Sequence, residues 1–485
     1  MRKSLQKPYR LVRCKMYFKT DKQISVFEFG QVAGITLDPE NRWIKKAHLI
    51  DWDMLEEKYS HLFCENNGRG AKPIRLALAA LIIKQEESFS DGGTLMHIKE
   101  NPYMQYFCGI KEFSYEDPFV PSLMVEFRKR FNEEIMREIN EIMFKPQEPI
   151  KNDDDKNDLP NSGTLILDAT CTPADVTYPQ DIILCNKARE KTEEMVETMH
   201  NGNIGKVEKP RLDKQKARLE YLKTAKGKNR SKKVIRKAIK KQLSFIKRNL
   251  GYMETLIKQG HYELLSTKQQ TDLETIKELY NQQKYMIENH TNSVENRIVS
   301  ISQPHICPIV RGKANAKVEF GAKVAISIIG GYCFVDHLSW DAYNESEDLI
   351  PIIKKYRETY GFYPEAVMVD KLYRNQKNIV FCNSKGIRIS GPKLGRPKKD
   401  EVVDKHQEYV DSGIRNAVEG KFGEGKTGYG LGKIKARLKV TSETVINLAF
   451  WVMNLNKRLR LLLHFFVIWS INAKFRHKNY VENCA

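Results

Sequence analysis

The sequence has few cysteines and no long apolar run. Its nine cysteines are scattered along 485 residues, are odd in number and form no Cys-x-x-Cys pair. Neither a disulfide framework nor a thiolate zinc site is therefore indicated. The longest late apolar run, Leu461–Trp469, is too short to span a bilayer, and no apolar signal-peptide core follows the basic N-terminus. We expect reduced cysteines, a cytoplasmic location and no membrane partner.

Acidic residues are outnumbered by basic ones. The chain has 81 Lys and Arg against 61 Asp and Glu, a formal net charge of +20. Nucleic acid is the first partner that such a balance suggests, and an anionic membrane surface is the second. Most of the excess positive charge lies between Lys206 and Arg248, a segment with 18 Lys and Arg and only three acidic residues. Charge runs are usually solvated helix surfaces, but concentration in one arm favours phosphate contact. The predicted DNA contacts in this arm are Lys232, Lys233, Arg236 and Lys237.

Residues 1–146 are predicted to form a mainly helical, DNA-binding domain. Helix starts are indicated at Pro73, at Ser90-Asp91, at Asn101-Pro102 and at Pro121-Ser122. Short helices that end in a basic one are typical of a helix-turn-helix-like module, in which Arg128, Lys129 and Arg130 would contact DNA. A plain helical subdomain whose basic residues are solvated explains the pattern equally well. Residues 147–163, rich in Pro, Asp and Gly, are predicted to be a linker.

The region 164–470 is predicted to be an α/β domain, followed by a C-terminal tail over 471–485. Apolar runs predict strands at 164–168 and 366–370, a hairpin over 318–336 and a short strand at 387–389. Between the first two strands in sequence, residues 186–297 carry two heptad seams, which predict an inserted antiparallel helical hairpin. The order of strands and helices that remains without the insertion predicts a ribonuclease H-like fold, a five-stranded mixed sheet with flanking helices. The strands at 164–168 and 366–370 would be neighbours in the centre of that sheet.

Three acidic residues have distinctive settings. Asp168 ends the run Thr164-Leu-Ile-Leu-Asp168, Asp370 ends Ala366-Val-Met-Val-Asp370, and Glu419 lies in a stretch with a helical pattern. Carboxylates at strand ends are held rigidly where ligands bind in open α/β sheets. Such hard oxygen ligands suit Mg²⁺, usually together with substrate phosphates. A lone strand-end Asp is more often a turn or cap residue, and Asp336 is the best rival for the third carboxylate.

The chain resembles bacterial insertion-sequence transposases of the DDE type, with a ribonuclease H-like catalytic domain. The segments that carry the resemblance are Leu167–Val176 with Tyr178–Asp181, Val369–Asn375, Gly391–Pro397 and Arg415–Gly423. The resemblance implies that Asp168, Asp370 and Glu419 bind the catalytic metals, expected to be two Mg²⁺ ions for which Mn²⁺ substitutes. It also implies binding to double-stranded DNA at the terminal inverted repeats of a mobile element. The implied chemistry is hydrolytic strand cleavage followed by joining of the freed 3′-OH to target DNA.

A related branch of that family carries a Tyr-x2-Arg-x3-Glu-x6-Lys signature. Arg415, Glu419 and Lys426 fit this spacing, but Ser412 stands where the Tyr would be. Arg415 lies one helical turn before Glu419, so it is placed either to hold that carboxylate or to contact DNA, and Lys421 and Lys426 are further candidate DNA contacts. Pairing two element ends implies a homodimer on DNA, located with the bacterial nucleoid. Two alternatives stay open: a non-catalytic or domesticated DNA-binding protein of transposase origin, and another ribonuclease H-fold nuclease.

Overall fold

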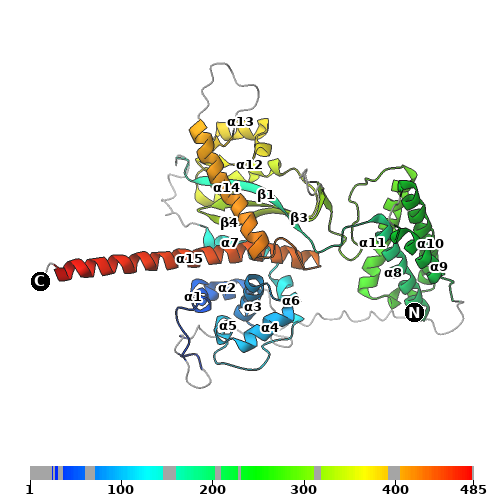
Figure 1. The fold of residues 1–485 in the computed structure, drawn as a ribbon, viewed down its shortest axis with the longest axis horizontal. Coiled ribbons are helices and arrows are strands. Elements are labelled where there is room, and N and C mark those ends of the chain that lie inside the picture. Colours follow the sequence, from blue (N-terminus) through cyan, green and yellow to red (C-terminus); the bar gives the residue numbers. More distant parts are fainter. Residues whose placement is uncertain are drawn as a thin grey trace, which may run out of the picture.

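The computed structural model describes residues 25, 28–30, 36–60, 72–145, 160–201, 209–227, 231–310, 318–391 and 405–482, with side chains up to residue 464. These residues form a helical N-terminal part, a central mixed sheet and a helical insertion that lies to one side of the sheet (Figure 1). Most of the predicted linker falls outside the described residues. None of the described helices is long and apolar enough to cross a membrane.

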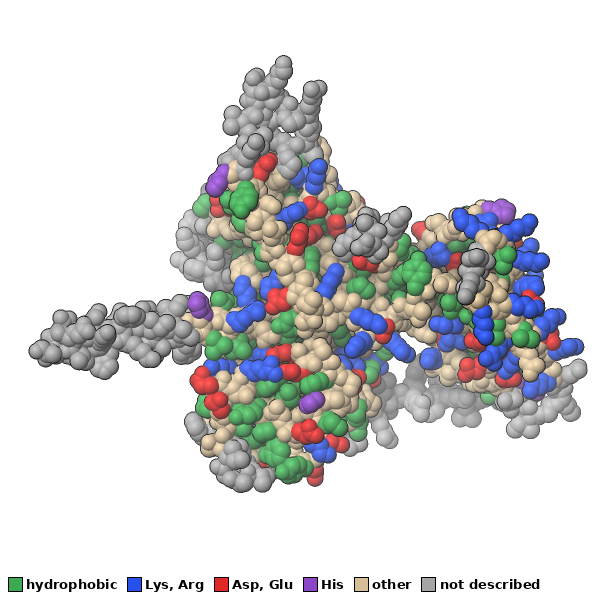
Figure 2. Space-filling view, in the orientation of Figure 1, with side chains coloured by type: hydrophobic (Ala, Val, Ile, Leu, Met, Phe, Trp, Pro, Cys, Tyr) green, Lys and Arg blue, Asp and Glu red, His purple; other side chains and the backbone are tan. Residues whose placement is uncertain are grey.

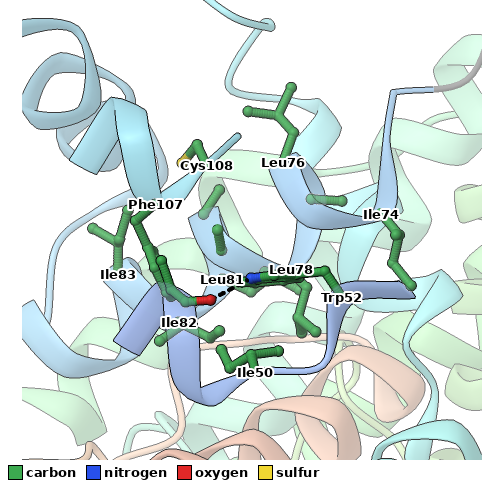
Figure 3. Packing of buried hydrophobic residues seen from close by; sticks show 14 of the residues in the cluster. Ile50, Trp52, Ile74, Leu76, Leu78, Leu81, Ile82, Ile83, Phe107 and Cys108 are labelled. Carbon is green, nitrogen blue, oxygen red and sulfur yellow. Dashed lines mark hydrogen bonds between the residues drawn. The ribbon is translucent and has the colours of Figure 1, made fainter. Parts of the chain in front are cut away.

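The N-terminal part contains seven described α-helices, of which α3 is almost completely buried. Every residue of α3 from Ile74 to Ile83 is buried, which explains why its sequence is apolar on all sides. Figure 3 shows Trp52 against this helix, with its indole Nε1 donating to the Ala47 carbonyl at 2.9 Å. The helices are α1 (Arg42–Leu49), α2 (Trp52–Ser60), α3 (Ile74–Glu87), α4 (Asp91–Glu100), α5 (Pro102–Phe107), α6 (Leu123–Arg130) and α7 (Glu133–Phe144).

The helix starts predicted from capping residues are confirmed. Ser90 accepts a hydrogen bond from the Gly93 amide at the start of α4, and Asn101 accepts from the amides of Tyr103 and Met104 at the start of α5. Each cap satisfies amides that have no partner within the helix. Pro73 lies one residue before the first turn of α3.

The central sheet contains six strands among the described residues, one more than predicted. In order across the main sheet they are β4 (Tyr332–Ser339), β3 (Val318–Ile329), β1 (Thr164–Pro173), β5 (Ala366–Met368) and β6 (Arg388–Ile389). The pairs β4–β3 and β3–β1 are antiparallel, whereas β1–β5 and β5–β6 are parallel. The additional strand, β2 (Pro308–Val310), pairs with the first residues of β3. This mixed order is consistent with a ribonuclease H-like fold, and it confirms that β1 and β5 are neighbours.

Gly321 allows β1 and β3 to approach closely at one end of their pairing. It lies opposite Pro173, and a Cβ built on it would be 2.1 Å from the Thr172 carbonyl oxygen. Any side chain would therefore push the two strands apart, so the glycine is required by packing.

Alternate residues of β1 enter two different cores. Leu165 and Leu167 pack with Ile353 of α12 (Leu349–Tyr360) on one face. Ile166 packs on the other face with α14 (Lys405–Gly428) and α15 (Lys439–Glu482). This is the period of two of an extended strand buried on both sides. The remaining elements of this region are η5 (Glu345–Glu347), η6 (Lys371–Tyr373) and α13 (Gln376–Ser384).

The helical insertion is larger than the predicted hairpin. It contains four α-helices, α8 (Asp181–Asn201), α9 (Lys214–Ala225), α10 (Lys232–Lys258) and α11 (Thr267–Glu288), with the short η4 (His261–Leu264). The hairpin prediction was wrong because the apolar stripes of α10 and α11 do not pack only against each other. Residues of α8 and α9 belong to the same hydrophobic core. The seam itself is confirmed at Ile239, Leu243 and Ile246, which are buried, and the predicted break occurs at Gly260, whose φ is +88°.

Helix α15 joins the N-terminal helices to the sheet. Leu448, Trp451 and Leu455 complete the N-terminal core, while Phe450 and Met453 belong to the core under the sheet. The Asn454 side chain also donates to Asn140 of α7 and accepts from the Cys333 amide of β4. The helix continues past residue 470, so the proposed start of the tail lies inside it.

Candidate active site

The register between β1 and β5 brings Asp168 and Asp370 together. Ile166 is paired with Met368, and each carboxylate lies two residues further along its own chain. Because side chains two residues apart point to the same face of an extended chain, both carboxylates are directed to the face covered by α14. The structure corrects one expectation: β1 does not end at Asp168 but continues to Pro173 against β3. Asp168 therefore lies within a strand, just beyond the point at which β5 stops.

Asp370 is held by the turn that follows β5. It caps η6, and its Oδ1 accepts a hydrogen bond from the Lys371 amide at 2.7 Å. Its side chain is half exposed. Asp370 is thus fixed by local capping, whereas Asp168 is fixed by the sheet.

Glu419 reaches the same place from helix α14. Ile414, Val418 and Phe422, spaced four residues apart, pack against the sheet. Arg415 and Glu419 each follow one of these residues and so lie along the edge of the buried stripe. Glu419 is therefore presented to the sheet face on which Asp370 lies.

Arg415 links the carboxylates of the strand and the helix. Its Nη1 lies 2.6 Å from Asp370 Oδ1, and its Nη2 lies 3.7 Å from Glu419 Oε1. The first contact is a charge-assisted hydrogen bond, and the second is an ion pair without one. A single guanidinium is consequently shared between two of the three predicted carboxylates.

Asp168 has a perturbed acidity. Burial raises the pKa of its carboxyl to about 6 from an ordinary value of 3.8. The Ala169 amide, which donates to Oδ1 at 2.8 Å, and the Arg415 charge oppose this rise in pKa, whereas Glu345 and Asp370 add to it. A carboxyl whose pKa is raised by burial beside other carboxylates is typical of a functional site.

The structure brings Glu345 towards Asp168 and places the rival Asp336 among other charged groups. Glu345 of η5 forms an ion pair of 2.9 Å with Lys323, and its charge acts on Asp168. Asp336 is buried elsewhere, where burial raises the pKa of its carboxyl to about 6 and its charged neighbours include Lys355 and Arg137. The sequence signal for Glu345 was weak because it lies in the three-residue helix η5, outside any strand. Contacts of Ser346 with Asn375 and Asn378 hold η5 beside the chain after Asp370.

The donor set suits a hard divalent cation, but it is not closed around one. Carboxylate oxygens are the ligands that Mg²⁺ and Mn²⁺ prefer. Within the described residues, however, no group of three or more His, Cys, Asp and Glu side chains is arranged to hold a metal ion. The Asp370 and Glu419 carboxylates are both engaged by the Arg415 guanidinium. Asp168, Asp370 and Glu419 are the residues whose oxygens could hold such an ion.

One predicted DNA contact is corrected by its burial. The Arg128 guanidinium makes two hydrogen bonds to Asp91, of 2.9 and 2.8 Å, and is only 7% exposed. It ties α6 to α4 and is not available to a phosphate. Lys129 is exposed and forms an ion pair with Glu126. Arg130 is partly buried beside Tyr59.

The basic arm lies on the surface of the helical insertion. Lys232, Lys233 and Lys237 of α10 are exposed, while Arg236 donates to the ring and carbonyl of His290. Figure 2 shows Lys and Arg side chains gathered over this part of the molecule. On α14, Lys421 forms an ion pair with Glu424 and Lys426 is partly buried.

Two family models match this chain, and both are transposase families. The model described as a transposase DDE domain matches residues 367–456, which include Asp370, Arg415 and Glu419. The model described as a transposase domain (DUF772) matches residues 33–130, in the N-terminal helices. Together the two matches indicate an insertion-sequence transposase of the DDE type. Asp168 and the helical insertion lie between the matched segments.

Comparison with curated proteins gives one short match. The chain is 30% identical over 103 residues to a Rhizobium meliloti protein named "Uncharacterized protein ORF8 in nfe locus". The match spans 21% of this chain and 49% of that protein. No solved structure matches the chain.

Proposed function

We propose that this chain is a transposase that binds the terminal inverted repeats of its own mobile element, cleaves the DNA by metal-dependent hydrolysis and joins the freed 3′-OH to target DNA. One observation carries the proposal: the Arg415 guanidinium draws Asp370 and Glu419 together on the sheet face to which β1 directs Asp168. Two of these carboxylates, Asp370 and Glu419, lie within the segment matched by the transposase DDE model, and Asp168 precedes that segment on the strand paired with β5.

The carboxylates have different roles in this proposal. Asp168, held within the central strand, is the rigid ligand, whereas the half-exposed Asp370 and Glu419 complete the site by turning their side chains. A pair of bound divalent ions would activate the attacking oxygen and stabilise the leaving oxygen of the phosphodiester. Backbone amides orient two of the three carboxylates. The Ala169 amide donates to Asp168, and the Lys371 amide donates to Asp370.

In this proposal DNA is held by basic side chains of α10, α14 and α6. The exposed lysines of α10 supply phosphate contacts over the insertion, and Arg415, Lys421 and Lys426 supply them along α14. Lys129 is the exposed basic side chain of α6. Two copies on DNA, one for each element end, complete the proposed assembly.

The test is strand cleavage of DNA that carries the element ends, with Mg²⁺ or Mn²⁺. We expect Asp168→Asn and Glu419→Gln to abolish cleavage while binding to the same DNA is retained. Arg388→Gln is the matched control, because it removes another arginine–carboxylate pair of α14, the one with Asp411. Equal cleavage by wild type and Asp168→Asn would refute the metal role of the carboxylates. DNA binding without cleavage by the wild type would instead favour a non-catalytic DNA-binding protein of transposase origin.

A further inference from the structure

The position of Arg415 in the carboxylate site has a consequence for metal binding. Its guanidinium lies 2.6 Å from Asp370 Oδ1 and 3.7 Å from Glu419 Oε1, and its charge lowers the pKa of Asp168. It is therefore the positive charge shared by Asp370 and Glu419. A divalent ion ligated by the same groups would be placed beside it, since carboxylate–metal distances are about 2.0–2.6 Å.

We propose that Arg415 is the resident counterion of this site, which divalent metal must displace from Asp370 and Glu419 in order to bind. The inference rests on the proposed function, because it assumes that these carboxylates are the metal ligands. The guanidinium neutralises part of the charge of Asp370 and Glu419. When metal enters, the guanidinium and the ion compete for the same carboxylates and repel one another.

The surroundings of Arg415 explain how it can leave. It is partly exposed on one edge of α14. Its neighbours, the partly buried Ile414 and the buried Val418, fix the helix without fixing the end of the Arg415 side chain. Asp370 Oδ1 keeps the Lys371 amide as a partner after Arg415 has moved. Glu419, 61% exposed, is free to turn towards Asp168 once its ion pair is broken.

The experiment measures Mn²⁺ binding to the full-length protein without DNA, by calorimetry and by the electron paramagnetic resonance of free Mn²⁺. We expect Arg415→Gln to bind Mn²⁺ about fivefold more tightly than wild type, the effect of removing one like charge from a partly exposed cluster. Arg415→Lys keeps the charge and should remain close to wild type. Arg388→Gln, which breaks the other arginine tie between α14 and the sheet, should leave the affinity unchanged.

The alternatives give different results. Equal or weaker Mn²⁺ binding by Arg415→Gln, with binding still removed by Asp168→Asn, would overturn the counterion role and leave the proposed function standing. In that case Arg415 would be a residue that organises the ligands. Mn²⁺ binding that Asp168→Asn does not change would show that the proposed metal site itself is wrong. Tighter binding by both Arg415→Gln and Arg388→Gln would also overturn the proposal, because loosening of α14 would then explain the gain.

Discussion

Replacing Asp168 with Asn is expected to stabilise the metal-free protein at neutral pH. Burial and the neighbouring carboxylates raise the pKa of the Asp168 carboxyl from 3.8 to about 6, so its charged form is disfavoured in the folded state. A shift of two units corresponds to about 3 kcal/mol of lost stability when the group is ionised. Asn carries no charge, and its side-chain oxygen can still accept the hydrogen bond from the Ala169 amide.

The sign of the pH dependence follows from the direction of the shift. A carboxyl whose pKa is raised in the folded state holds its proton more tightly there than in the unfolded chain. Its cost to stability is absent below pH 3.8, where both states are protonated, and is complete above pH 6. The advantage of Asp168→Asn should therefore be largest at pH 7–8 and shrink as the pH falls from 6 towards 3.8.

Urea and thermal unfolding of both proteins in EDTA, at several pH values, measure this difference. Saturating Mg²⁺ should reverse the order, because bound metal stabilises the wild type and Asp168→Asn lacks the ligand. If Asp168→Asn were no more stable than wild type at pH 8 in EDTA, Asp168 would not be a strained, buried carboxylate. An advantage independent of pH would show that the gain does not come from ionisation.

Three further predictions concern the rest of the molecule. Changing Lys232, Lys233 and Lys237 to Gln should reduce the slope of log K against log salt for DNA binding by up to about 3, since each phosphate contact contributes about 0.9. Arg128→Ala should lower the free energy of unfolding by about 2–3 kcal/mol, because Asp91 loses its buried partner, with no loss of DNA affinity per folded molecule. Gly321→Ala should cost about 2 kcal/mol or more, measured by urea unfolding, because its Cβ would lie 2.1 Å from a carbonyl oxygen.

Controls separate these effects from general charge or packing changes. Lys277→Gln with Lys284→Gln removes lysines from α11 of the same insertion, where both are paired with acids, and should alter the salt slope less. An equal change would mean that the α10 face has no special role. Loss of DNA affinity by folded Arg128→Ala, or a fully stable Gly321→Ala, would contradict the packing described for α6 and β3.

The order of the sheet could be predicted from the sequence because its strands are short apolar runs with clear periodicity. Val318–Ile329 alternates, and its Gly-Gly turn forces the hairpin with Tyr332–Ser339. The length of β1 could not be predicted, because residues after Asp168 are polar or small and carry no apolar pattern, yet they pair with β3. The strand β2 was missed for a similar reason, since three residues give no periodicity.

The candidate site, too, could be predicted from the sequence only in part. The acidic residues could be selected from their strand and helix settings, but the ion pair of Arg415 with Asp370 joins residues 45 positions apart and depends on how α14 crosses the sheet. Sequence could not show that Arg128 is buried, because Lys129 beside it is exposed, Arg130 is partly buried, and the helix pattern does not separate the three. The hairpin prediction failed because heptad seams identify a buried stripe without saying how many helices cover it.

The central claim, that Asp168, Asp370 and Glu419 together bind a divalent metal, is tested most directly by replacing Mg²⁺ with Fe²⁺. Ascorbate and peroxide then cut the polypeptide next to the bound ion, and mass spectrometry locates the cuts. We predict cuts near residues 168, 370 and 419 that excess Mg²⁺ suppresses and that are absent in Asp168→Asn. Cuts elsewhere, or cuts at these positions that survive in Asp168→Asn, would contradict the account.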